Sequence, residues 1–148
     1  MKHLHSLSIR VFIKENEDLD AIKNCLELFL PIDNEKESFL EEERVLIDEQ
    51  SSMTICKAQL KKKRHCNRCV AILKELLGKK QCELITSQTN RVDEDGIGYV
   101  RIQKEPFVTR QEAVLTDAGD CIHFSFQLAA FPKTQEKART VMKELFKE

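Results

Sequence analysis

The sequence contains one pair of cysteines at a spacing that can do chemistry, Cys66 and Cys69 in the segment CNRC. Two thiols separated by two residues can supply half of a tetrahedral zinc site or form a redox pair. A structural zinc needs four ligands, and the sequence has no second pair at a matching spacing. Both thiols also fall on the apolar stripe of an expected helix, where cysteine packs as a small hydrophobic side chain. We therefore expect a core position for the pair, without a metal or a cofactor.

Signatures of enzyme active sites are missing from the rest of the sequence. There is no glycine-rich phosphate-binding loop and no Gly-x-Ser-x-Gly turn. None of the four histidines has an evident nucleophile as a partner. Asp117 and Asp120 flank an expected turn, where aspartate is common because its side chain bonds the local backbone. The sequence therefore favours a protein that is not an enzyme and takes no small-molecule substrate.

Basic side chains concentrate in one segment, residues 57–68, which has six Lys or Arg residues and no acid. These residues are Lys57, Lys61, Lys62, Lys63, Arg64 and Arg68. Cations at the start of a helix interact unfavourably with the helix dipole, so helix stability does not explain them. Contact with the phosphates of a nucleic acid is one interpretation, and an ordinary solvated helix start is the other.

The net charge hides this concentration, because 24 basic residues nearly balance 25 acidic ones and leave a total of −1. Residues 33–49 carry eight acids and two bases, which makes them the opposite pole of the molecule. A net charge is a sum, whereas binding takes place on local patches. The balance therefore permits RNA binding through a patch, weaker than that of a uniformly basic protein.

Periodic patterns predict the elements that position these residues. Strands are expected at residues 4–13, 37–49, 53–60, 97–104, 113–116 and 121–131. Helical spacing is present at residues 19–30, 66–77 and 134–145. Gly78 is expected to cap the second helix. Residues 79–95 fit either a short helix or an irregular crossover.

Hairpins dominate this order of elements, so the sheet should be mostly antiparallel, with single-stripe helices covering one face. We expect a single domain over residues 1–148, an α+β two-layer sandwich. No apolar run approaches the roughly 20 residues of a membrane-spanning helix, and the N-terminus lacks the apolar stretch of a signal peptide. A cytoplasmic protein with reduced cysteines and no membrane contact is therefore expected.

The uncovered face of the expected sheet combines basic, amide, hydroxyl and aromatic groups. They are Ser6, Ser8, Arg10, Phe12, Lys57, Gln59, Tyr99, Arg101, Gln103, His123, Ser125 and Gln127. Single-stranded RNA platforms use such a mixture, stacking bases on aromatic rings and guanidinium planes. An ordinary solvated sheet face is the alternative interpretation.

Three stretches in order, residues 3–12, 91–104 and 116–132, resemble a known family. Within them are the run RVDEDG followed by YVR and Lys104, and the run TDAGD leading to AAFP. The sequence is similar to a small archaeal RNA-binding family described as a predicted exosome-associated subunit. The fold of that family is similar to that of the large-subunit ribosomal protein L-five, which binds 5S ribosomal RNA.

This resemblance extends over essentially the whole chain and implies an antiparallel α+β fold, RNA as the ligand and an archaeal cytoplasm. It also implies association with an RNA-processing complex such as the exosome, or with ribosomal RNA, and no established catalytic activity. The matching positions that could bear function are Arg91, Asp93, Gly96, Tyr99, Arg101 and Lys104.

The leading hypothesis is a non-catalytic protein that binds structured or single-stranded RNA. The residues expected to contact RNA are Lys57, Lys61, Lys62, Lys63, Arg64, Arg68, Arg91, Tyr99, Arg101 and Lys104. The alternative is a protein–protein adaptor, in which the acidic hairpin at residues 37–49 docks a basic partner and RNA has no direct role. A third hypothesis is a thiol- or metal-dependent activity at Cys66 and Cys69.

Overall fold

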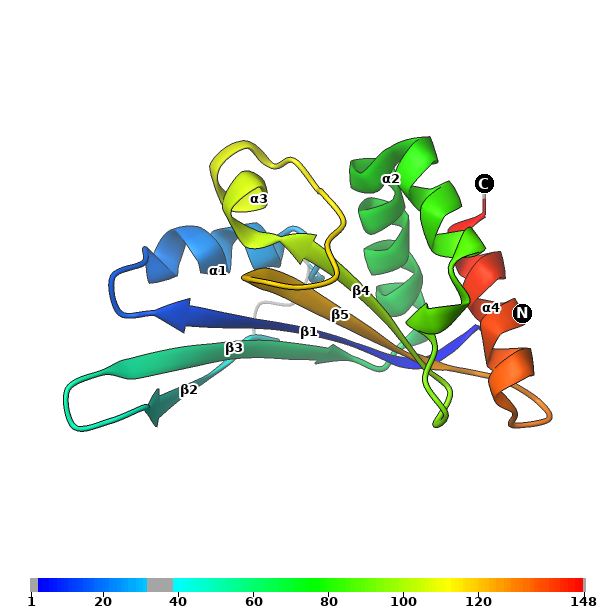
Figure 1. The fold of residues 1–148 in the computed structure, drawn as a ribbon, viewed down its shortest axis with the longest axis horizontal. Helices are drawn as coiled ribbons and strands as arrows, with labels where there is room; N and C mark the ends of the chain where they lie inside the picture. Colours follow the sequence, from blue (N-terminus) through cyan, green and yellow to red (C-terminus); the bar gives the residue numbers. More distant parts are fainter. Residues whose placement is uncertain (1–2, 32–38, 148) are drawn as a thin grey trace.

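The computed structural model describes residues 3–31 and 39–147, and within them five strands form one antiparallel sheet with the order β2-β3-β1-β5-β4. The strands are β1 (Leu4–Lys14), β2 (Glu41–Leu46), β3 (Ser52–Leu60), β4 (Ile97–Gln103) and β5 (Cys121–Leu128). The helices are α1 (Leu19–Glu27), α2 (Lys63–Ser87), α3 (Lys104–Arg110) and α4 (Gln135–Phe146), and a single 3₁₀ turn spans Thr89–Arg91. All four helices lie on the same face of the sheet (Figure 1). The expected α+β two-layer sandwich is confirmed.

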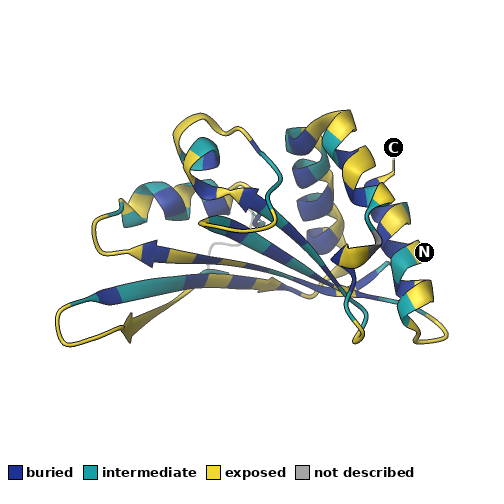
Figure 2. Ribbon diagram, viewed as in Figure 1, coloured by how far each residue is buried: buried dark blue, intermediate teal, exposed yellow. Residues whose placement is uncertain are grey.

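The core lies between the sheet and the helix layer. Along β1, Leu7, Ile9, Val11 and Ile13 are at most 2% exposed, while the residues between them reach the other face. The same alternation runs along β5, and it is visible as alternating colours on the strands in Figure 2. Side chains alternate between the two faces of a strand, so one covered face produces this period of two. The residues that the sequence placed on the uncovered face of β1, β3 and β5 alternate with these buried ones, as predicted.

Helix α2 consists of two helical segments, of which the second follows the end that the sequence predicted. Gly78 has φ 79° and ψ 170°, a non-helical conformation that glycine adopts without steric cost, and it separates the two segments at a kink. Beyond the kink, Cys82 and Ile85 are buried. The predicted end of the first helical segment at Gly78 is therefore confirmed, and of the two alternatives for the following residues the helix is correct as far as Ser87.

The thiols of Cys66 and Cys69 lie in this core, 1% and 0% exposed. Burial raises the pKa of the Cys69 thiol to about 12, so the reactive thiolate is scarce at neutral pH. Among the residues that the structure describes, no group of three or more His, Cys, Asp or Glu side chains is arranged to hold a metal ion. The core position expected for this pair is confirmed.

The connection from β4 to β5 differs from the prediction. Helix α3 was not predicted, and the strand expected at residues 113–116 is wrong, since only an isolated bridge joins Leu115 to Ile102 there. Pro106 lies in the first turn of α3, where a missing N–H is tolerated. The helix forms because Phe107 is fully buried and stacks on Phe29, with ring centroids 5.6 Å apart.

Candidate nucleic-acid interface

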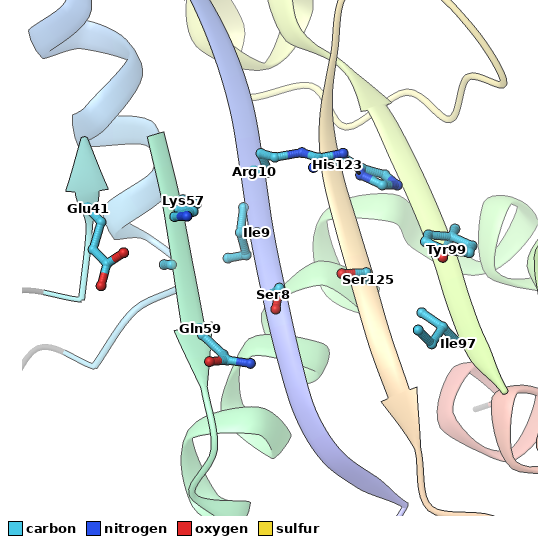
Figure 3. A pocket seen from close by; sticks show the side chains of 11 residues that line it. Ser8, Ile9, Arg10, Glu41, Lys57, Gln59, Ile97, Tyr99, His123 and Ser125 are labelled. Carbon is cyan, nitrogen blue, oxygen red and sulfur yellow. Dashed lines mark hydrogen bonds between the residues drawn. The ribbon is translucent and has the colours of Figure 1, made fainter. Parts of the chain in front are cut away.

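A row of basic side chains crosses the face of the sheet that the helices leave uncovered, which we call the open face. The strand register places Arg10 opposite Lys57 on one side and opposite His123 on the other, and His123 opposite Arg101. Directly opposed residues on neighbouring strands point to the same face. Lys57, Arg10 and His123 accordingly project together from β3, β1 and β5 (Figure 3). We refer to Lys57, Arg10, His123 and Arg101 as the basic row.

The two arginines of this row lack acidic partners. Among the described residues, no carboxylate lies within ion-pair distance of Arg10 or Arg101. The Arg10 guanidinium lies 5.4 Å from the centre of the Phe12 ring, and that of Arg101 lies 6.0 Å from the centre of the Tyr99 ring. Planar guanidinium groups beside aromatic rings are the surfaces on which RNA bases stack. The row therefore offers both positive charge and stacking planes.

His123 lies between the two arginines. Burial, together with the charges of Arg101 and Arg10, lowers the pKa of His123 from 6.5 to about 4, so the ring is neutral at neutral pH. A guanidinium only donates, so the contact of 3.4 Å from Arg10 makes Nδ1 the acceptor and puts the ring proton on Nε2. This Nε2 atom is buried and has no hydrogen-bond partner among the described residues. A buried donor without a partner lowers the stability of the fold by about 1–3 kcal/mol, and such donors are rare in native proteins.

Tyr99 is half-buried beside the row and held in place from two sides. Its ring lies parallel to that of His123, with 5.3 Å between the ring centres, and its hydroxyl donates a hydrogen bond of 2.8 Å to Asp93 Oδ2. Burial and the neighbouring Asp93 raise the pKa of the Tyr99 hydroxyl. The ring is thus fixed before any ligand arrives.

The predicted basic residues at the start of α2 lie where they were expected. Lys61, Lys62, Lys63 and Arg64 are exposed and directly follow β3, the strand that carries Lys57. We call these four residues the basic segment. Arg68 is less available, because it is half-buried and its guanidinium donates to the carbonyl of Leu30 at 2.7 Å.

Two predicted contact residues lie inside the molecule, which corrects the sequence interpretation. Lys104 is 2% exposed, and its Nζ bonds Glu17 Oε1 at 2.8 Å and Asp120 Oδ1 at 2.9 Å. Arg91 is 8% exposed, bonds Gln88 Oε1 through its Nε, and lies 3.6 Å from the exposed carboxylate of Asp117. Lys104 therefore cannot reach a phosphate outside, and the guanidinium of Arg91 is already paired. The alternation of side chains along the strand predicts burial for Lys104, because residues 100, 102 and 104 point to the same inward side.

Two residues of the basic row were missing from the predicted contacts. The sequence pattern placed Arg10 and His123 on the outward face of the sheet, but gave no reason to prefer them over their neighbours there. Their importance comes from the pairing of β1 with β5, which joins residues 113 positions apart. Pairing over such a separation is not encoded in any local pattern.

The acidic hairpin of the alternative hypothesis lies at the edge of the sheet. All six residues of β2 are exposed, and Glu42 forms an ion pair with Lys23 of α1. Glu41 lies opposite Lys57 and so borders the basic row. Residues 37 and 38 of the predicted hairpin lie outside the described residues. No helix in the described part of the chain is both long and apolar enough to cross a membrane.

Comparisons with known proteins identify relatives of this chain and its family. A protein of Pyrococcus abyssi named as an RNA-binding protein is 26% identical over 145 residues, which cover 95% of this chain and 92% of that protein. A DUF54 protein from Methanothermobacter thermautotrophicus has the same fold, with a TM-score of 0.77 at 18% identity, covering 98% of this chain and 99% of that one. A DUF54 protein from Archaeoglobus fulgidus has a TM-score of 0.78 at 23% identity, covering 97% and 98%. Residues 6–128 match the model of a family described as RNA binding, and the chain therefore belongs to that RNA-binding family.

Proposed function

We propose that this protein binds RNA on the open face of its sheet and does not catalyse a reaction. The observation that carries the proposal is the basic row, in which Arg10 and Arg101 flank a neutral His123 without a carboxylate partner among the described residues. Neighbouring cations repel each other, and a phosphate placed between them removes that repulsion. Membership of the RNA-binding family supports RNA as the source of the phosphate.

The basic segment extends this interface beyond the end of β3. Lys57 connects the two parts, because it belongs to the basic row and lies on β3, the strand that leads into the basic segment. Four exposed cations add phosphate contacts that do not depend on base sequence. Each neutralised phosphate of a single strand contributes about −0.7 to the slope of log affinity against log salt concentration.

Titration of a fluorescently labelled RNA at several salt concentrations tests the basic row. The double variant Arg10→Gln/Arg101→Gln should bind at least about tenfold more weakly than the wild type, because two charged contacts are lost. A matched control is Lys79→Gln/Lys80→Gln, which makes the same change of charge at exposed positions of α2 in the helix layer. Equal affinity of the two variants would contradict the proposal.

A second titration tests the basic segment separately. Replacing Lys61, Lys62, Lys63 and Arg64 by Gln should make the salt slope shallower by up to ~3. A slope equal to that of the wild type would remove the segment from the interface and leave the basic row to be judged by its own variant.

We extend the proposal to a cytoplasmic setting in an RNA-processing complex such as the exosome, or on ribosomal RNA. The similarity to the ribosomal protein L-five fold belongs to the same set of predictions. Their support is the resemblance carried by residues 3–12, 91–104 and 116–132. Purification from native cells, with and without ribonuclease, tests the setting through the proteins and RNAs that are retained. Recovery of neither an RNA nor a processing subunit would contradict it.

A further inference from the structure

A hollow lies beside the basic row on the open face. Its volume is about 510 Å³, within the range of sites that hold small molecules. The register explains the hollow, because Gln59, Ser8, Ser125 and Tyr99 are directly opposed across four strands and the two central side chains are small. Ser8 and Ser125 therefore form a floor between the larger side chains of Gln59 and Tyr99 (Figure 3).

The groups that line the hollow can both donate and accept hydrogen bonds. Among the described residues, the side chains of Ser8, Gln59 and Ser125 have no hydrogen-bond partner, whereas the neighbouring Ser6 hydroxyl is bonded to Gln127. Hydroxyl and amide groups match the edges of bases and the 2′-hydroxyl of ribose, which carry donors and acceptors side by side. The floor of the hollow thus suits the uncharged polar edge of a ligand.

Charge and stacking are arranged around this polar floor. Arg10 and Lys57 belong to both the hollow and the basic row and bring two cations to one side of it, where Glu41 adds one carboxylate. Tyr99 supplies an aromatic wall whose orientation is fixed by Asp93 and His123. A polar cavity with a ring on one side and cations on another matches a nucleotide, whose base and phosphate need these different surroundings.

We infer that this hollow holds an unpaired RNA base and that the protein therefore selects single-stranded over duplex RNA. In a duplex the bases are stacked and paired, so they cannot enter a concave site, and a double strand presents only its backbone and groove edges. The inference rests on the proposed function, since it specifies the kind of RNA bound at the same face. The base lies against Tyr99 with its edge on Ser8 and Ser125, and its phosphate is held by the basic row.

The experiment compares a short single-stranded RNA with the blunt duplex formed by annealing it to its complement. Ser125→Phe fills the floor of the hollow without changing the charge, and aromatic residues are favoured on a half-buried strand face. Wild-type protein should bind the single strand at least tenfold more tightly than the duplex, and Ser125→Phe should bind the two RNAs alike. Ser87→Phe, at an exposed position on α2, is the matched control and should keep the wild-type preference.

A second variant covers the case in which Ser125→Phe does not fold. Tyr99→Ala removes the aromatic wall and should lower the single-strand affinity about tenfold, which also reduces the preference over the duplex. Equal wild-type affinity for the two RNAs, or a wild-type preference in folded Ser125→Phe, overturns the inference and leaves the proposed RNA binding standing. Failure of wild-type protein to bind either RNA overturns both.

Discussion

Arg101 on β4 and Lys104, the first residue after it, lie three residues apart in the sequence but in different surroundings. Lys104 is buried between Glu17 and Asp120, and its ammonium group also bonds the carbonyl of Phe12. Arg101 lies on the open face, beside the Tyr99 ring, with no carboxylate within ion-pair distance among the described residues. Lys104 connects β1 with the turns that precede α1 and β5, whereas Arg101 keeps its charge on the open face.

The difference shows that the number of charges in a segment does not measure what is available for binding. A buried cation that satisfies two carboxylates contributes to folding specificity and adds nothing to the surface potential that RNA meets. A cation without a partner is the one that gains from a phosphate. Substitutions at the covered side of β4 should therefore change stability, and those at its open side should change RNA affinity.

The largest effect is expected for Lys104→Met. The substitution keeps an apolar chain of similar length but leaves two carboxylates facing each other, partly relieved by their own exposure to water. We expect a loss of about 3 kcal/mol in the free energy of unfolding, measured with urea. RNA affinity of the folded protein should stay at the wild-type level.

Lys14→Met is the control for this prediction, because Lys14 approaches the same Asp120 at 3.9 Å from an exposed position. Its loss should stay below about 1 kcal/mol, as for other surface ion pairs. If the two lysine variants were equally stable, the contrast between buried and exposed cations would not hold.

Gly98→Ala should have the next largest effect, again on stability. Gly98 faces the helix layer, and a methyl group there would lie 2.7 Å from Sδ of Met142. Methionine can adapt, so the expected loss is about 2 kcal/mol by urea denaturation, with RNA affinity retained. In a Met142→Ala background the same substitution should cost less, because the atom in conflict is gone. An equal loss in both backgrounds would place the strain elsewhere.

The sequence predicted the faces of the strands well, and for a physical reason. Leu7, Ile9, Val11 and Ile13 alternate with polar residues, since β1 has one covered and one open face. Helix α3 escaped prediction because it has seven residues, too few for a periodic signal, and forms to bury Phe107. Gly78 ends the first segment of α2, as its residue type predicted, whereas the pattern of the second segment, which buries Cys82 and Ile85, did not distinguish a helix from an irregular crossover.

The candidate site was only partly predictable. The run of basic residues in the sequence predicts the exposed basic segment, and the alternation along β4 predicts that Tyr99 and Arg101 lie on the open face. The basic row does not, because its order depends on which strands pair and in which register. The hollow depends on the same register, since it exists only because two serines meet side by side at its floor.

A smaller effect is expected for Arg101→Lys, which keeps the charge and removes the planar guanidinium. If Arg101 serves both as a cation and as a stacking plane, the RNA affinity should fall about threefold, with an unchanged salt slope. Arg110→Lys is the control, because Arg110 pairs with Glu112 away from the open face. If Arg101→Lys bound RNA with the wild-type affinity, only the charge of Arg101 would matter. Urea denaturation should show the same stability for the wild type and both variants.

The last prediction concerns the titration of His123. Its pKa in the folded protein is about 4, below the usual 6.5, so the unfolded chain binds more protons between these values. Stability should therefore fall as the pH is lowered from about 6.5 to 4. The groups that face this ring are Arg10, Arg101 and Tyr99, and His123→Asn removes the titration while keeping them. The difference between wild type and variant isolates the histidine, since all other groups titrate in both. Bound RNA should shrink this difference, because a phosphate beside the two arginines offsets the positive charge that, together with burial, keeps His123 neutral.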